Sequence, residues 1–187
     1  HEFHVLADSG EDAIAYSTES DYAANIEKCA VLAPKTSRAP ATEELSIVET
    51  PNKKTIQEIC DFLGVKHKKV VKTLLVEGVD SPIALVIRGD HELNEIKANN
   101  LEDVKSPLTF LEDREIKQTA GCDAGSIGVK DLNCKIIIDQ AVEVMSDFIT
   151  GANKDDKHLR GVNWQRDAKY DLVADLRNVQ VGDLSPD

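Results

Sequence analysis

Two aliphatic runs, at residues 70–76 and 83–88, constrain the fold of this chain more than any other feature. The first reads VVKTLLV and the second IALVIR, so both are rich in the branched residues that favour β-strands. A short segment that contains glycine, aspartate and proline separates them. Two such runs on either side of a turn segment predict an antiparallel β-hairpin.

Helix signals and further strand signals lie on both sides of this hairpin. The stretch TIQE at residues 55–58 is a capping box, apolar residues follow it at helical spacing, and Gly64 stands where a helix C-cap belongs. Asp90 can cap a second helix. Because strands and helices mix without a regular βαβ repeat, we expect an α+β fold with a mixed, mainly antiparallel sheet. The other predicted elements are a hairpin between residues 3–7 and 12–17, helices over residues 20–32, 91–101 and 106–121, and strands over residues 134–139 and 161–164.

Length, charge and cysteine usage exclude several classes of protein. With 187 residues, the chain is long enough for one domain, or for one domain with extensions. A formal net charge of −12 argues against a broad nucleic-acid-binding face, although it allows contact with one nucleotide at the end of a nucleic acid. No apolar run approaches the roughly 18 residues of a membrane span. The four cysteines form no C-x-x-C pair, so we expect reduced thiols in a cytoplasmic protein.

Lys72 interrupts the first aliphatic run. Strand side chains alternate between two faces, so Lys72 shares its face with Leu74 and Val76. A lysine in this place either packs its stem while the ammonium reaches water, or presents a cation to a phosphate or a developing oxyanion in a pocket. Between residues 52 and 72, six lysines stand against two carboxylates. This asymmetry favours an anion near the strand, although a run of like charge is also typical of a solvated face.

Three further features carry weaker signals. Asp139 follows an aliphatic strand, where it either positions a substrate group or caps a helix over residues 140–148. His158 stands in a predicted polar loop, where a histidine is usually exposed. Residues 121–128 hold three glycines, but they lack the Gly-Lys-Ser/Thr ending of a nucleotide-binding loop. His1 and His4 have no third ligand nearby, so we expect no metal site.

Several stretches of the chain together resemble the bacterial prolyl-tRNA synthetases. The clearest are TPNKKTIQEICDFLGV from residue 50, VIRGDHELNEIKANNL from residue 86, KHLRGVNW from residue 157 and DLRNVQVGDLSPD from residue 175. The resemblance runs in register over nearly the whole chain. It corresponds to the insertion domain between the second and third class II signature motifs, which is a member of the YbaK-like editing superfamily. It implies a mixed, mainly antiparallel, barrel-like sheet surrounded by helices.

The resemblance also implies how the chain is divided. Residues 1–45 correspond to a flank from the catalytic body of the synthetase plus a linker, and the Ala- and Pro-rich residues 33–44 fit that linker. Residues 46–168 correspond to the YbaK-like editing insertion, and residues 169–187 to a return segment. The first residue is not methionine, so we expect a piece of a longer chain.

The implied function is cis-editing, in which the domain hydrolyses the aminoacyl ester of alanyl-tRNA(Pro). Alanine is smaller than proline, and missing methylenes allow discrimination of only about 1–3 kcal/mol, so a second hydrolytic site is the usual remedy. The implied partners are the alanine-charged 3′ end of tRNA(Pro) and the rest of the synthetase chain, with no membrane. The parent enzyme is expected to be a homodimer that uses ATP and Mg to ligate proline, whereas editing is expected to need no cofactor.

The resemblance assigns roles to individual residues. Lys72, Asp139 and His158 correspond to the catalytic residues of the family, and water is the expected nucleophile, assisted by a hydroxyl of the tRNA. Val129 stands where the glycine loop of the family commonly has proline. The implied substrate-binding residues are Thr73 and the loop residues Gly125, Ser126, Ile127 and Gly128.

Two other readings of the function stay open at this point. One is a free-standing trans-editing deacylase of the same superfamily. The other is a structural insertion that supports a synthetase without hydrolysing anything.

Overall fold

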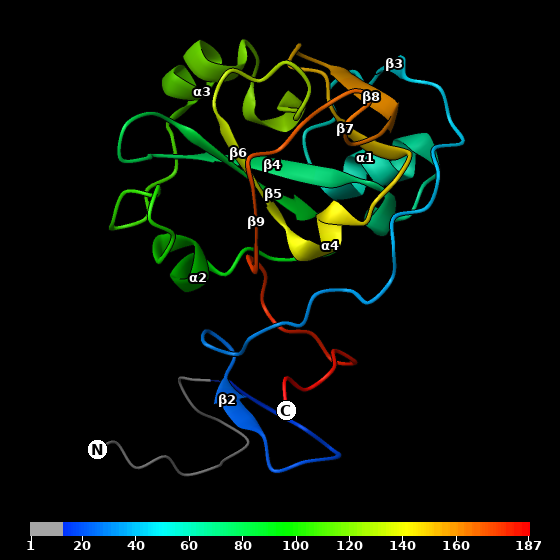
Figure 1. Ribbon diagram of the computed structural model, residues 1–187. Helices are drawn as coiled ribbons and strands as arrows, with labels where there is room; N and C mark the ends of the chain where they lie inside the picture. The colour runs from blue at the N-terminus through cyan, green and yellow to red at the C-terminus, as the bar shows by residue number, and fades with distance from the viewer. Residues whose placement is uncertain (1–12) are drawn as a thin grey trace.

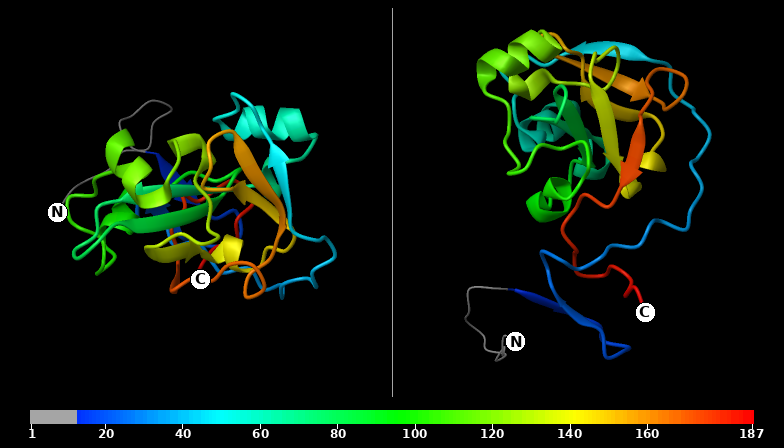
Figure 2. Two further views of the ribbon diagram at one scale, coloured as in Figure 1. Left: turned by 90° about the horizontal axis from the view of Figure 1, so that it is seen from above. Right: turned by 60° about the vertical axis from the view of Figure 1, so that its left-hand side comes forward.

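The computed structural model describes residues 13–187. A main body with two β-sheets lies at one end of the molecule, and the two terminal segments of the described chain lie together at the other end (Figures 1 and 2). Within the described part, no helix is both long and apolar enough to cross a membrane. Residues 3–7 of the predicted hairpin, together with His1 and His4, fall outside the described residues.

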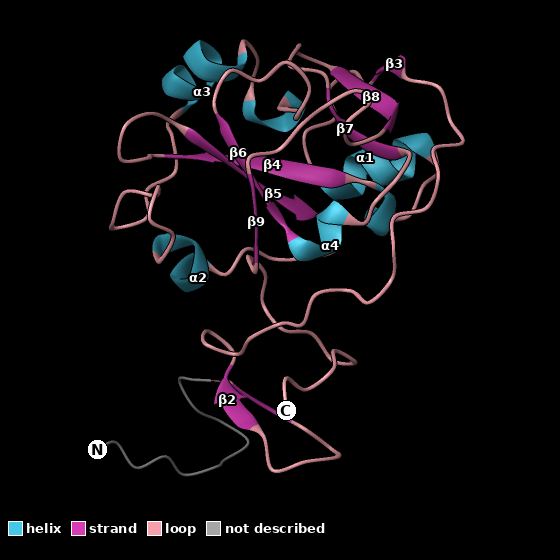
Figure 3. Ribbon diagram, viewed as in Figure 1, coloured by secondary structure: helices cyan, strands magenta, loops and turns pink. Residues whose placement is uncertain are grey.

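The larger sheet has four strands in the order β4-β5-β6-β9 (Figure 3). The predicted hairpin is confirmed, since β4 and β5 pair antiparallel with Lys72 opposite Ile87. The β5–β6 and β6–β9 pairs are parallel, so the sheet is mixed. Its strands are β4 (Val71–Val76), β5 (Ile83–Arg88), β6 (Lys135–Asp139) and β9 (Leu172–Ala174).

The smaller sheet is antiparallel and has the order β3-β8-β7. His158 lies in its central strand, opposite Val48 and Gly151, so the prediction of an exposed loop histidine is wrong. The surrounding charged residues suggested a loop, but pairing on both sides makes this segment a strand and buries the imidazole. The strands are β3 (Ser46–Glu49), β7 (Phe148–Gly151) and β8 (Lys157–Val162).

The two sheets do not close into a barrel, so the barrel-like expectation is not confirmed. Next to β7, the edge of β4 has only the isolated bridge between Val70 and Ile149. At its other end this edge is occupied by residues 109–111, because Leu111 N donates to Leu75 O at 3.0 Å and Glu77 N donates to Thr109 O at 2.9 Å. Within residues 13–187, no strand pairs with the stretch of β4 between these two contacts, so this stretch is an open edge.

The helices are short and lie around the sheets. Helix α1 has the predicted capping box of Thr55 and Glu58, and Gly64 ends it with φ = 64°. Helix α2 is shorter than predicted because Asn94 caps it, whereas Asp90 pairs with Arg88. Helix α3 is shorter because residues 109–111 lie along β4. The helices are α1 (Ile56–Leu63), α2 (Glu95–Asn99), α3 (Asp113–Ala120) and α4 (Gln140–Glu143), with the 3-10 turns η1 (His67–Lys69) and η2 (Ala124–Ser126).

The helix predicted over residues 20–32 is absent from the structure, and a two-stranded ribbon takes its place. Strand β1 (Ile14–Tyr16) pairs antiparallel with β2 (Ala23–Asn25). The Asn25 side chain accepts a hydrogen bond from Glu27 N at 2.9 Å, a local bond that competes with a helix. Residues 29–45, which include the predicted linker at residues 33–44, contain no helix or strand.

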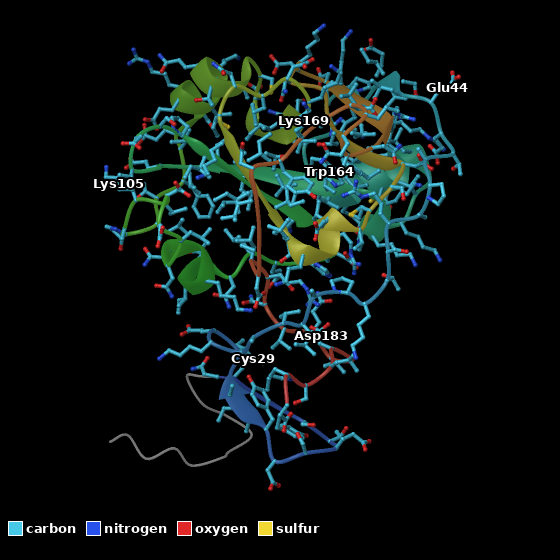
Figure 4. All side chains as sticks on the ribbon, in the orientation of Figure 1. Cys29, Glu44, Lys105, Trp164, Lys169 and Asp183 are labelled. Atoms are coloured by element: carbon cyan, nitrogen blue, oxygen red, sulfur yellow. The ribbon has the colours of Figure 1, made fainter. Side chains whose placement is uncertain are left out.

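The main core lies between the two sheets. Trp164, which is labelled in Figure 4, is buried within this core. Its ring centroid lies 5.0 Å from that of Phe148 and 5.2 Å from that of Tyr170. The indole N–H donates to Val142 O at 2.9 Å, so the polar edge of the ring is satisfied. All four cysteines lie in the described part, and none of them forms a disulfide there.

Candidate functional site

A cavity of about 230 Å³ lies beside the open edge of β4. Residues 71–74, between the two contacts that cover the ends of this edge, line it. Peptide groups of alternate residues in a strand point to the same edge. Since Leu75 O and Glu77 N point away from β5, the peptide groups of Thr73 point the same way, towards the cavity.

The walls of the cavity come from five segments that are separate in the sequence. One wall is apolar and comes from the first turns of α1 and from the start of β4. The opposite wall comes from the glycine loop around η2, from the end of β7 and from β8. The lining residues are Lys54, Thr55, Ile56, Ile59, Val70, Val71, Lys72, Thr73, Leu74, Ala124, Gly125, Ile127, Gly151 and His158.

Lys72 lines this cavity as a half-buried cation. Burial lowers the pKa of its ammonium, while the fields of Glu92 and Asp90 act in the opposite direction. Neither carboxylate is bonded to it, and Asp90 is paired with Arg88 at 2.6 Å instead. An ammonium that has lost part of its water without gaining a bonded counterion is suited to hold an anionic or partly negative ligand group.

His158 is held by a buried hydroxyl. Its Nδ1 lies 2.8 Å from Oγ1 of Thr50, and neither residue is more than 4 % exposed. Burial lowers the pKa of His158 to about 4, so the imidazole is neutral at pH 7. Because Nδ1 is engaged by Thr50, Nε2 is the nitrogen left to act on a ligand in the cavity.

Thr73 contributes a buried hydroxyl that has no partner in the described part of the chain. The residue is 5 % exposed and lines the cavity, and its Oγ1 makes no hydrogen bond. Leaving such a group unsatisfied costs about 1–3 kcal/mol, so each case in a native structure calls for an explanation. Because Thr73 lines the cavity, this unsatisfied hydroxyl is a candidate contact for a ligand there.

The glycine loop packs backbone to backbone against β7. A Cβ atom on Gly128 would stand 1.7 Å from the carbonyl oxygen of Gly151, so only glycine fits at position 128. Asn153 fastens the loop, because its Oδ1 accepts from Gly128 N at 2.7 Å and its Nδ2 donates to Lys130 O at 2.8 Å. The loop presents Gly125 and Ile127 to the cavity, whereas Ser126 and Gly128 do not line it.

Substitution of Gly128 by alanine is expected to destabilise the fold by about 3 kcal/mol or more, since the added methyl group meets backbone that has no room to move. Urea unfolding measures this. Gly64→Ala is the matched control: no atom lies within 4 Å of its added Cβ, and only the left-handed backbone costs about 1–2 kcal/mol. Equal losses in the two variants would contradict the close approach of loop and strand.

Asp139 is not brought together with Lys72 and His158, since it does not line the cavity. It caps α4 by accepting from Ala141 N at 2.9 Å, and it also accepts from Leu176 N at 3.0 Å. Burial raises the pKa of this carboxyl, and the two N–H groups act against that rise. Of the two readings of Asp139, the structure shows the helix cap, and a catalytic role stays a prediction.

Sequence reasoning missed several residues of the site. Ile56 and Ile59 were assigned only to a helix face, and Thr50 and Asn153 received no role. The sequence does indicate Ile56 and Ile59, because a capped helix that directly precedes the strand of Lys72 is expected to pack near that strand. No local pattern indicates Thr50, because its partner His158 lies 108 positions further along the chain. Within residues 13–187, no group of three His, Cys, Asp or Glu side chains could hold a metal ion.

The chain is similar to one protein family and to several solved structures. The model of the aminoacyl-tRNA editing domain family matches residues 50–168. Among solved structures, a proposed trans-editing enzyme for prolyl-tRNA synthetase is 20 % identical, with a TM-score of 0.59 over 72 % of this chain and 87 % of its own. A hypothetical protein is also 20 % identical, with a TM-score of 0.58 over 72 % and 92 %. A scaffold protein with a computationally grafted epitope is 19 % identical, with a TM-score of 0.60 over 72 % and 88 %. These likenesses show a shared fold.

Proposed function

Because this chain belongs to the aminoacyl-tRNA editing domain family, we propose that its cavity beside β4 hydrolyses the aminoacyl ester of alanyl-tRNA(Pro). The family implies aminoacyl-tRNA deacylase activity in general. The observation that carries the assignment to this cavity is that Lys72, Thr73 and His158 all line it. A cation, an unpaired buried hydroxyl and a neutral imidazole are together able to hold an ester and a water molecule.

The size of the cavity supports a small aminoacyl group. Its volume of about 230 Å³ lies below the roughly 300–1,000 Å³ of pockets that hold drug-sized ligands. Ile56, Ile59 and Val70 form an apolar wall that suits a methyl side chain. A second, hydrolytic site is needed where a synthetase meets a smaller amino acid than its own, as alanine is to proline.

The residues of the cavity have distinct roles in the proposed hydrolysis. The oxygen of a water molecule bonds to the carbonyl carbon, the ester bond breaks, and the leaving ribose oxygen takes up a proton, which yields free alanine and tRNA. With a pKa of about 4, His158 is a poor general base at pH 7, so we assign its Nε2 to positioning this water. Lys72 stabilises negative charge on the terminal phosphate or on the carbonyl oxygen, and Thr73 binds the aminoacyl group. Asp139 stabilises the backbone that supports the site, through the hydrogen bonds that it accepts from Ala141 N and Leu176 N.

The arrangement of the terminal segments supports a domain inserted in a synthetase, which acts in cis. The two segments are joined, since Val31 N donates to Asp175 at 2.9 Å and Ser20 Oγ donates to Asp187 at 3.0 Å. The two segments come together below the main body (Figure 1), as the two connections of an inserted domain would. A cytoplasmic, homodimeric parent that uses ATP and Mg is part of this proposal.

A free-standing trans-editing deacylase is the alternative, and the shared fold with a proposed trans-editing enzyme for prolyl-tRNA synthetase favours it. The two proposals differ in the role of residues 13–45 and 169–187, which connect the domain to a synthetase only in the first of them. In a free-standing enzyme, the chain alone would turn over alanyl-tRNA(Pro) as fast as any larger assembly.

The test is deacylation of tRNA(Pro) charged with alanine or with proline, measured under single-turnover conditions with the protein in excess. Excess protein is needed because a net charge of −12 disfavours tight binding of tRNA. We expect alanine to be released at least about 10-fold faster than proline, in keeping with the 10- to 200-fold discrimination that small size differences allow. Equal release of both amino acids would remove the alanine assignment, and release of neither would favour the structural insertion.

A further inference from the structure

An exposed aromatic ring stands next to the cavity on α1. Phe62 is 50 % exposed, although phenylalanine is usually buried. It lies three residues after Ile59, which lines the cavity, and side chains three apart are neighbours on a helix surface. The ring therefore lies at the exposed surface of the helix that supplies the apolar wall, and it is not itself part of the cavity lining.

One lysine lies over this ring, and its neighbour in the sequence lines the cavity. The Lys53 ammonium lies 5.8 Å from the centroid of the Phe62 ring, within the range of a cation–π contact. Lys54, the next residue, lines the cavity. Of the two carboxylates in this region, Glu58 is occupied by the capping box, where it accepts from the backbone of Lys54 and Thr55 at 3.0 and 2.9 Å. In a chain with a net charge of −12, this surface is locally suited to phosphate.

We propose that Phe62 and Lys53 form a docking surface for the nucleotide that precedes the terminal adenosine of the charged 3′ end. Its base stacks on the exposed part of the Phe62 ring, and Lys53 neutralises the adjoining phosphate. An aromatic ring accepts any base, which suits a single-stranded end, and the charge of the lysines favours nucleic acid over an apolar peptide. The proposal rests on the proposed function, because it presumes that the aminoacyl ester occupies the cavity and that the terminal adenosine lies at its mouth.

The test compares two substrates that differ by this nucleotide. One is alanine-charged tRNA(Pro), and the other is alanyl-adenosine, which ends at the terminal nucleoside. In the variant Phe62→Ala, we expect kcat/KM for the charged tRNA to fall about 5- to 100-fold, while hydrolysis of alanyl-adenosine is unchanged. Phe62→Trp should retain most of the activity on tRNA, because indole also stacks. Lys53→Ala should reduce the slope of log affinity against log salt by about one unit.

Phe110→Ala is the matched control, since Phe110 is 42 % exposed and does not line the cavity. We expect this variant to handle both substrates like the wild type. Equal losses in Phe62→Ala and Phe110→Ala, or an equal loss on tRNA and on alanyl-adenosine, would overturn the docking surface.

Binding of an uncharged RNA that ends in CCA separates this proposal from the proposed function, since it needs no hydrolysis. If the wild type cleaves neither ester, the proposed function fails, and weaker binding of this RNA by Phe62→Ala still supports the docking surface. Equal RNA binding by Phe62→Ala and the wild type would refute the docking surface even where hydrolysis is intact.

Discussion

Substitution of Lys72 by alanine is expected to slow the hydrolysis of alanyl-tRNA(Pro) by about 100- to 1,000-fold, the loss typical of removing one group that stabilises developing charge. The reason lies in the state of its ammonium. It is half-buried and lines the cavity, and no carboxylate of residues 13–187 is bonded to it, so its charge is available to the phosphate or the ester of the substrate. The rate of deacylation with protein in excess measures the effect directly.

The same variant is expected to be as stable as the wild type or slightly more stable. Burial lowers the pKa of Lys72, which means that the folded protein disfavours the charged form, and no hydrogen bond to a carboxylate is lost. Thermal unfolding checks this point. A loss of activity together with an unchanged Tm separates a role in hydrolysis from a role in folding.

Lys68→Ala is the matched control for Lys72→Ala. Lys68 is an exposed member of the same lysine-rich region and does not line the cavity, so its removal changes the local charge equally. We expect less than about a 3-fold effect from it, because exposed charges are screened by water and salt. If both variants lose the same activity, general attraction of the tRNA explains the effect and the assignment of Lys72 to the site is wrong.

Local signals in the sequence were sufficient for the elements that carry Lys72. The hairpin of β4 and β5 and the capped helix α1 depend on contacts between near neighbours, such as the bond between Thr55 and Glu58. The mistakes arose where distant pairing decides the structure. The charged residues around His158 suggested a loop, but β3 and β7 pair with this segment from both sides and make it a buried strand.

The cavity could not be predicted as a shape, although several of its residues were. It exists because β4 is covered only at its two ends, by Ile149 and by residues 109–111, and this depends on how distant segments meet. The resemblance pointed to Lys72 and His158, and the structure places both on the cavity lining. One of the two hydrogen bonds that hold Asp139 comes from Leu176 N, which lies 37 positions away, and no local pattern in the sequence indicates this partner.

Substitution of His158 by alanine is expected to slow hydrolysis by about 100-fold, at the lower end of the range for groups that handle protons or water in a reaction. In the wild type, the neutral imidazole is the active form. Its pKa of about 4 predicts a rate contribution that is constant from pH 6 to pH 8 and is lost as the pH falls through about 4, because protonation gives the ring a positive charge and makes both of its nitrogens donors. The pH profile of single-turnover deacylation measures this.

A rise in activity with an apparent pKa of 6–7 would contradict the buried, neutral state of His158. Thr50→Val tests the support of the ring, since valine keeps the shape of threonine and removes the hydroxyl that lies 2.8 Å from Nδ1. We expect a smaller loss of rate than in His158→Ala, because the imidazole remains but is no longer held in one orientation. Unchanged activity would show that the Thr50 contact serves the fold alone.

The same pKa predicts a change in stability with pH. His158 binds a proton near pH 6.5 in the unfolded chain but only near pH 4 in the folded one, so the unfolded state holds more protons between these values. The free energy of unfolding is therefore expected to fall by about 3 kcal/mol as the pH is lowered from 7 to 4, at 1.36 kcal/mol for each pKa unit. Urea unfolding of the wild type and of His158→Gln at both pH values isolates this contribution, because the carboxylates titrate alike in both proteins. If the two proteins lose the same stability on acidification, His158 is not held neutral by burial, and the assignment of its Nε2 to the attacking water loses its physical basis.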